Sequence, residues 1–238
     1  MPDDHGPDVH QRRFESVAAL TETLSTEIAA ALQGGLAAGR GASLLVPGGH
    51  TPIPLFERLS RAELDWASVW VSLTDERWVD THSSASNERL VREHLLRNEA
   101  AGANFVGLKT AEREARRSEV ASWSTLAEVP RPFDFVLLGM GEDGHVASLF
   151  PGSPDLTSAL DPAAPPGCVG MTAPVPPHMR MSLNLRALLD SRRIVVMITG
   201  RDKWATYQHA RMHGAAAQMP VRALLAQQNV PTSVYWAP

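Results

Sequence analysis

Apolar residues recur along this chain in two patterns that alternate from one end to the other. Between Phe14 and Leu32 they recur at helical spacing, which predicts an amphipathic helix that ends at Gly34-Gly35. Similar segments predict helices at 55–59, 87–98, 111–127, 202–212 and 220–227, with FVGL (105–108) between the second and third of these. Short apolar runs predict strands at 43–46, 69–73, 133–138, 168–171, 180–185, 194–198 and 233–236.

This alternation of strand and helix predicts an α/β fold with a parallel-rich sheet and helices on both of its faces. No linker divides the chain, so a single domain is expected over residues 12–238, preceded by a polar, frayed tail over residues 1–11. The proline-rich segment 151–179 is typical of a surface loop, and long loops at a sheet edge often border an active site.

Composition narrows the classes of function. The formal net charge of −4 provides no basic field for nucleic acid, although a few local cations can still hold a small anion. No apolar run approaches the roughly 18–20 residues of a membrane helix, and the N-terminus lacks the plan of a signal peptide. Cys168 is the one cysteine, which excludes an intramolecular disulfide and a cysteine-based zinc site and is compatible with a cytoplasmic protein. Its expected role is that of a buried structural thiol.

The stretch FVLLGMGEDGHVASLF (135–150) contains the G-x-G-x-x-G spacing of a dinucleotide-binding loop. Its other residues argue against that function. Glu142 and Asp143 would repel a pyrophosphate, and the region about 20 positions further on is proline-rich instead of a strand end. Asp143 and His145 instead form a candidate general base, because an Asp near a His fixes its tautomer and raises its basicity. The alternative is a tight strand-to-helix turn with a solvated His.

A second glycine loop follows the strand at 43–46. Gly48 and Gly49 would expose backbone amides and Thr51 could cap the next helix, which together favour an anion site. The alternative is an ordinary turn with a Thr cap. Asp75, Glu76 and Arg77 directly follow another strand, either at a functional edge of the sheet or in a solvated turn.

Two further cations are candidates for binding an anion. Arg180, at the start of a strand, could hold a phosphate bidentately or lie along the sheet edge with its charge in water. Lys203 lies in the first turn of a helix, where the helix dipole disfavours a cation, so pairing with an anion is expected. His209 and His213, four positions apart, are expected to be structural, and Ser148 lacks the G-x-S-x-G context of a nucleophile.

These motifs, in this order, resemble the 6-phosphogluconolactonase family. The matching stretches are PGGHTP (47–52), TDERWV (74–79), SNERLVREHLL (86–96), FDFVLLGMGEDGHVASLFPG (133–152), HMRMSLNL (178–185) and ITGRDKW (198–204). The resemblance implies a three-layer αβα sandwich with a mostly parallel, modified Rossmann-like sheet, as in glucosamine-6-phosphate deaminases. It also implies hydrolysis of 6-phospho-D-glucono-1,5-lactone in the pentose phosphate pathway, with no cofactor, no metal and a monomer or weak homodimer.

The resemblance also implies a role for each candidate residue. His145 would be the general base, with Asp143 beside it, while Arg77 would bind substrate or the oxyanion and Asp75 would order that loop. The substrate phosphate would be bound by Gly48, Gly49, Thr51, Arg180 and Lys203. The family pattern has hydroxyl residues around the two glycines, whereas this chain has Pro47, which lacks a hydroxyl and an amide donor, and His50.

Two other functions are associated with related sequences. Deaminases of the same fold carry a Glu shortly after the His, in DGHIAFNEP, whereas this chain reads DGHVASLFPGSP and lacks it. A sugar-phosphate sensor would attach this fold to a helix-turn-helix module, for which the chain has no room. The expected partner is therefore a small sugar-phosphate lactone, with no nucleic acid and no membrane.

Overall fold

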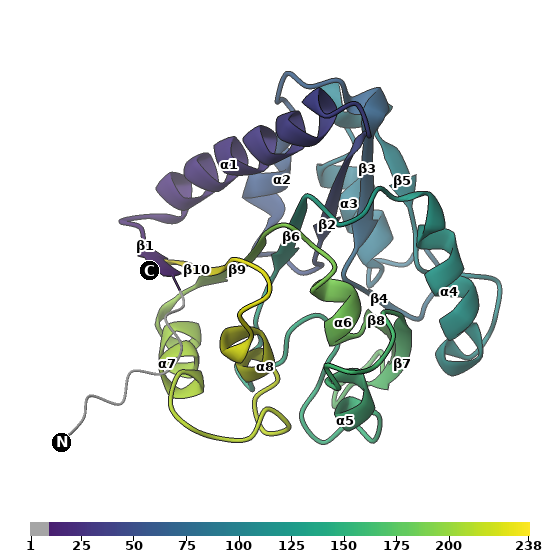
Figure 1. Ribbon diagram of the computed structural model, residues 1–238, viewed down its shortest axis with the longest axis vertical. Helices are drawn as coiled ribbons and strands as arrows, with labels where there is room; N and C mark the ends of the chain where they lie inside the picture. The colour runs from purple at the N-terminus through teal and green to yellow at the C-terminus, as the bar shows by residue number, and fades with distance from the viewer. Residues whose placement is uncertain (1–9) are drawn as a thin grey trace.

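A computed structural model describes residues 10–238, which form a seven-stranded sheet flanked by helices (Figure 1). Its strand order is β1-β10-β9-β6-β2-β3-β5, and every neighbouring pair is parallel. The strands are β1 (His10–Arg13), β2 (Ala42–Val46), β3 (Val69–Leu73), β5 (Asn104–Val106), β6 (Phe135–Leu138), β9 (Ile194–Thr199) and β10 (Thr232–Ala237). The predicted parallel-rich α/β fold is confirmed.

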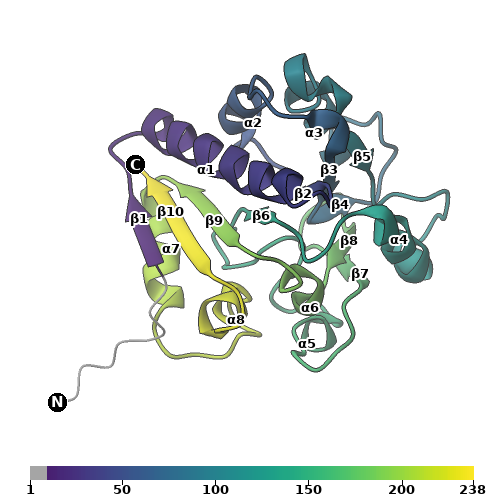
Figure 2. The same ribbon diagram turned by 45° about the horizontal axis from the view of Figure 1, so that its top comes forward.

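Helices cover both faces of this sheet, with α1 on one face and α7 and α8 on the other (Figure 2). The helices are α1 (Val17–Ala37), α2 (Ile53–Leu59), α3 (Asn87–His94), α4 (Glu119–Thr125), α5 (Leu156–Ala159), α6 (Leu185–Leu188), α7 (Arg201–Ala210) and α8 (Val221–Ala226). Strands β2 and β6 are buried along their whole length, as expected for parallel strands covered on both faces. No helix among residues 10–238 is long and apolar enough to cross a membrane.

Two predicted boundaries near the N-terminus are corrected. Helix α1 continues through Gly34-Gly35 to Ala37, because Gly35 faces the sheet, where a Cβ would lie 2.9 Å from Asp134 Oδ2. That glycine therefore permits close packing and does not end the helix. Of the tail assigned to residues 1–11, residues 1–9 lie outside the described chain, whereas His10 and Gln11 belong to β1 and pair with Ser233 and Val234.

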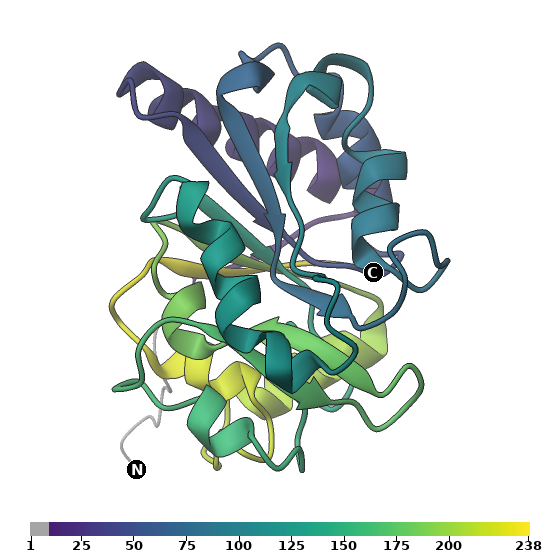
Figure 3. The same ribbon diagram turned by 90° about the vertical axis from the view of Figure 1, so that its right-hand side faces the viewer.

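A second, three-stranded antiparallel sheet lies beside the main one and was missed by the sequence patterns (Figure 3). It consists of β4 (Asp75–Arg77), β8 (Met179–Leu183) and β7 (Cys168–Thr172). The charged segment at Asp75 is therefore a short strand. The strands predicted at 168–171 and 180–185 are confirmed as β7 and β8, and the proline-rich segment 151–179 also contains α5, which was not predicted. Three residues are too few for periodicity to identify β4.

The order of strands in the main sheet reverses between β2 and β6. From β2 the chain proceeds outward through β3 and β5, and from β6 it proceeds in the other direction through β9 and β10. Connections that diverge in this way leave a crevice at the carboxyl ends of the two central strands, where open α/β sheets bind ligands. The two glycine loops singled out in the sequence follow these two strands.

Candidate active site

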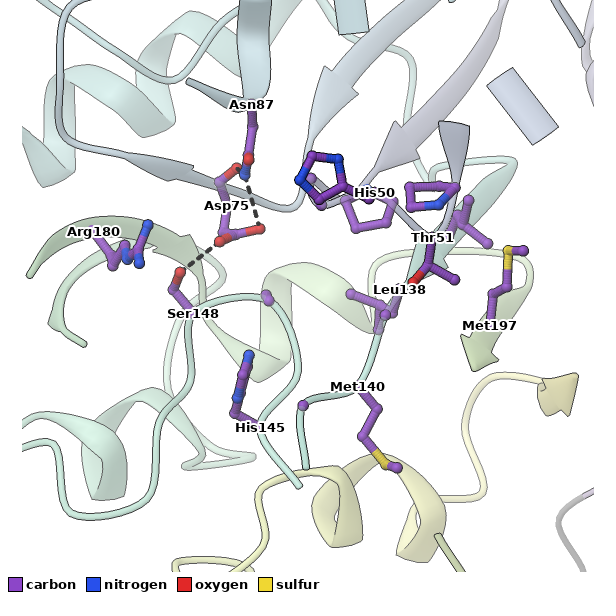
Figure 4. Close-up of a pocket in the computed structure, with 18 of the residues that line it drawn as sticks. His50, Thr51, Asp75, Asn87, Leu138, Met140, His145, Ser148, Arg180 and Met197 are labelled. Carbon is purple, nitrogen blue, oxygen red and sulfur yellow. Dashed lines mark hydrogen bonds between the residues drawn. The ribbon is translucent and has the colours of Figure 1, made fainter. Parts of the chain in front are cut away.

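A cleft of about 480 Å³ lies at this point of strand reversal (Figure 4). The structure brings together every candidate residue there except Asp143, which contacts the cleft through His145. The predicted residues that line the cleft are Gly48, Gly49, Thr51, Asp75, Arg77, His145, Arg180 and Lys203. We call residues 47–52, after β2, the cradle loop and residues 139–148, after β6, the base loop.

In the base loop, Asp143 holds His145 in a fixed orientation. Its Oδ1 lies 2.6 Å from His145 Nδ1 and also accepts the His145 backbone N–H at 3.0 Å. Burial opposes ionisation of Asp143, but these hydrogen bonds outweigh it and lower the pKa of that carboxyl. With Nδ1–H donated to Asp143, Nε2 is the ring nitrogen left to accept a proton. The ring packs against Phe150, at 4.4 Å between centroids, and points into the cleft (Figure 4).

The glycines of the base loop serve this arrangement directly. A Cβ on Gly141 would lie 2.1 Å from the His145 ring, and Gly144 has a φ of +78°. After the loop, the next helix is α5, which begins only at Leu156. The loop therefore neither opens a helix, as a dinucleotide-binding loop does, nor forms the alternative strand-to-helix turn.

The cradle loop presents unpaired backbone amides to the cleft. Within residues 10–238, no acceptor is bonded to the amides of Gly48, Gly49, His50 and Thr51. Gly49 has a φ of +86°, and Gly48 packs so closely on Asn87 that a Cβ would lie 1.8 Å from Asn87 Oδ1. Thr51 does not cap α2, whose cap residue is Pro52, so its hydroxyl is left for the cleft. Free amides and a hydroxyl are the groups that a phosphate requires.

The small antiparallel sheet supplies the charged wall. Asp75 lies opposite Ser182 and Arg77 opposite Arg180, so these four side chains share one face. Arg180 is only 6% exposed, and its Nε and Nη1 have no partner among the described residues. Burial and the nearby Arg77 both lower the pKa of Arg180, against the opposing effect of Asp75. Arg180 is thus a buried cation without a direct partner, and an anion in the cleft would satisfy it.

Arg77 and Lys203 complete the set of cleft cations. Arg77 donates from Nη1 to the Ala85 carbonyl at 2.8 Å, which leaves the rest of its guanidinium for the cleft. Lys203 lies in the first turn of α7 and forms no ion pair with any carboxylate of the described chain. No group of three residues suited to hold a metal ion is found in residues 10–238.

The sequence did not indicate the structural roles of three buried residues that hold this wall together. Ser148 donates to Asp75 Oδ2 at 2.5 Å, and Asn87 donates to the Asp75 backbone carbonyl at 2.8 Å (Figure 4). Glu76 accepts the backbone N–H groups of Asn87 and Glu88 at the start of α3, while its burial raises its pKa. Ser86 and Asn87, which open α3, form a capping signal that can be detected in the sequence. No sequence feature indicated that Asn87 would contact Asp75.

Known proteins of one family resemble this chain in sequence and in structure. The family model described as glucosamine-6-phosphate isomerases/6-phosphogluconolactonase matches residues 15–236. The chain is 41% identical to a 6-phosphogluconolactonase of Rhizobium meliloti, over 94% of this chain and 97% of that one. It is also 41% identical to one of Pseudomonas aeruginosa, with 94% and 92% covered. A crystal structure of a 6-phosphogluconolactonase from Shewanella baltica superposes with a TM-score of 0.93 at 42% identity, covering 97% of this chain and 98% of that one.

Proposed function

The chain belongs to the family of glucosamine-6-phosphate isomerases and 6-phosphogluconolactonases, and we propose that it hydrolyses 6-phospho-D-glucono-1,5-lactone to 6-phospho-D-gluconate. Its high identity and coverage with 6-phosphogluconolactonases make it an enzyme of that type, which acts in the pentose phosphate pathway. The observation that carries the proposal is a cleft with an Asp143–His145 pair in one loop and, in the other, four amides that have no acceptor in the described part of the chain.

In the proposed reaction, His145 Nε2 takes a proton from a water molecule as that water attacks the lactone carbonyl carbon. Asp143 keeps Nδ1 protonated and stabilises the imidazolium that forms. Arg77 stabilises the negative charge that develops on the carbonyl oxygen. When the tetrahedral intermediate collapses, the ring C–O bond breaks and the imidazolium returns its proton to the leaving ring oxygen. General-base help of this kind contributes roughly 10²–10⁴ in rate.

The other end of the substrate is its phosphate. The free amides of the cradle loop, the Thr51 hydroxyl and the cations Arg180 and Lys203 support phosphate binding there. Pro47 has no amide proton to donate, so the first amide donor of the cradle loop is that of Gly48. His50, which lines the cleft, stands where the family pattern has a hydroxyl residue.

The deciding experiment is hydrolysis of the phosphorylated lactone by the purified full chain, with the spontaneous rate in buffer subtracted. We expect rapid turnover of this substrate and much slower turnover of D-glucono-1,5-lactone, which lacks the phosphate. A corrected rate equal to zero for the phosphorylated lactone would refute the proposed function. Equal rates for both lactones would keep lactone hydrolysis but refute the phosphate cradle.

A further inference from the structure

The peptide group just before Asp143 and the one just before His145 are each held by a helix. Thr206 in α7 donates its hydroxyl to the Glu142 carbonyl at 3.1 Å, and the Val221 N–H at the start of α8 donates to the Gly144 carbonyl at 2.9 Å. In the described chain, these are the two hydrogen bonds that reach Gly141 to His145 from other elements. The direction of the Asp143 carboxylate therefore depends on α7 and α8.

Helix α7 is itself firmly fixed at its first turn. The Gly200 N–H donates to the Ala237 carbonyl at 3.0 Å, and the Trp236 indole donates to the Gly200 carbonyl at 2.9 Å. Trp204 packs against Trp236, at 4.9 Å between ring centroids, and the Arg13 guanidinium lies 4.4 Å from its ring. The helix start is thus attached to strands β1 and β10, whereas the base loop has no regular structure of its own.

One face of α7 carries both a residue that lines the cleft and a residue that holds the base loop. Lys203 and Thr206 are three positions apart and so are neighbours on the helix surface. Lys203 lines the cleft, and Thr206 holds the loop that carries Asp143 and His145. We propose that Thr206 is a positioning residue for the reaction: its bond to Glu142 fixes the general base relative to the cation that receives the substrate phosphate. This rests on the proposed lactone hydrolysis.

The Thr206→Val variant tests the proposal, because valine keeps the shape of the side chain and removes the hydroxyl. Loss of one net hydrogen bond in the loop should reduce kcat about threefold to tenfold, since misplacement of a base costs rate. KM should stay within about twofold, and so should the inhibition constant of inorganic phosphate, because Lys203 is unchanged. Amide hydrogen exchange should become faster in residues 141–145 and stay unchanged in α1.

Two variants serve as controls. Thr206→Ser retains a hydroxyl and should restore most of kcat. Thr26→Val removes the same kind of bond, from an exposed helical threonine to the Glu22 carbonyl on α1, and should leave kcat unchanged. An unchanged kcat and exchange pattern in Thr206→Val would overturn the proposal, as would a loss that Thr206→Ser fails to restore. Either result leaves lactone hydrolysis standing, whereas an inactive wild-type protein would refute both.

Discussion

The cradle loop and the base loop look alike in sequence, since each follows a buried parallel strand with closely spaced glycines. In the structure they differ in what their polar groups do. The polar groups of the base loop are bonded to other protein groups. Asp143 is bonded to His145 and Gly141 donates to the His145 carbonyl, while the Glu142 and Gly144 carbonyls accept from α7 and α8. The cradle loop leaves four successive amides without an acceptor among residues 10–238.

This difference separates two kinds of chemistry. A general base needs one side chain held in one orientation, so hydrogen bonds to the protein must fix the loop around it. An anion site needs donors that are left unsatisfied until the ligand arrives. Changes in the base loop should therefore act mainly on kcat, and changes at the phosphate end mainly on KM.

The largest effect should follow from His145→Ala. Loss of the base should lower kcat by roughly 10²–10⁴, with a modest change in KM, measured by the corrected rate of lactone hydrolysis. His209→Ala, on the exposed side of α7, is the matched control and should retain wild-type kcat. Near-full activity of the His145 variant would show that another group accepts the proton, and Asp75 would be the next candidate base.

At the end of the cleft proposed to bind phosphate, Lys203→Ala should raise KM about tenfold to a hundredfold, because the proposed charged contact to the phosphate would be lost. The kcat should change little, and the kinetics of the phosphate-free lactone should not change at all. Saturation curves for both lactones give this comparison. An equal loss for the two substrates would show that Lys203 does not act through the phosphate.

Within the cradle loop, Gly48→Ala should collide with Asn87 and force both to move. We expect a loss of about 1–3 kcal/mol in the free energy of unfolding, together with a higher KM. Gly34→Ala is the control, because a Cβ there meets nothing within 4 Å and alanine favours a helix by about 0.5–1 kcal/mol. Denaturant unfolding of both variants checks the pair, and a Gly48→Ala protein as stable as wild type would contradict the close contact.

The smallest effect concerns Asp143, whose pKa is lowered in the folded state, by hydrogen bonds from His145 that outweigh its partial burial. Its stabilising contribution is present above the ordinary Asp pKa of about 3.9 and disappears as the pH falls through the lower folded value. The free energy of unfolding of Asp143→Asn should therefore be lower than that of the wild type at neutral pH. The two values should converge in acid. Glu142→Gln, its exposed neighbour, should lack this convergence, and an Asp143→Asn difference that persists in acid would exclude the linkage.

The sequence by itself determined the main sheet, its parallel character and most of its elements. Short apolar runs and helical periodicity reveal these features because both patterns depend on burial alone. It also located many of the residues that line the cleft, although not Asn87 or Ser148. The reason is that the carboxyl ends of parallel strands meet at one edge. It misjudged the end of α1 because a helical glycine that permits close packing cannot be told locally from one that ends a helix.

Only the tertiary structure decided how these residues are held. Strand β4 is three residues long and exists because it pairs with β8, more than 100 positions away, and this pairing buries Arg180 beside Asp75. The contacts of Ser148 and Asn87 with Asp75, and of Thr206 with Glu142, likewise join distant segments. Such contacts leave no local pattern, because each depends on where the fold places both partners.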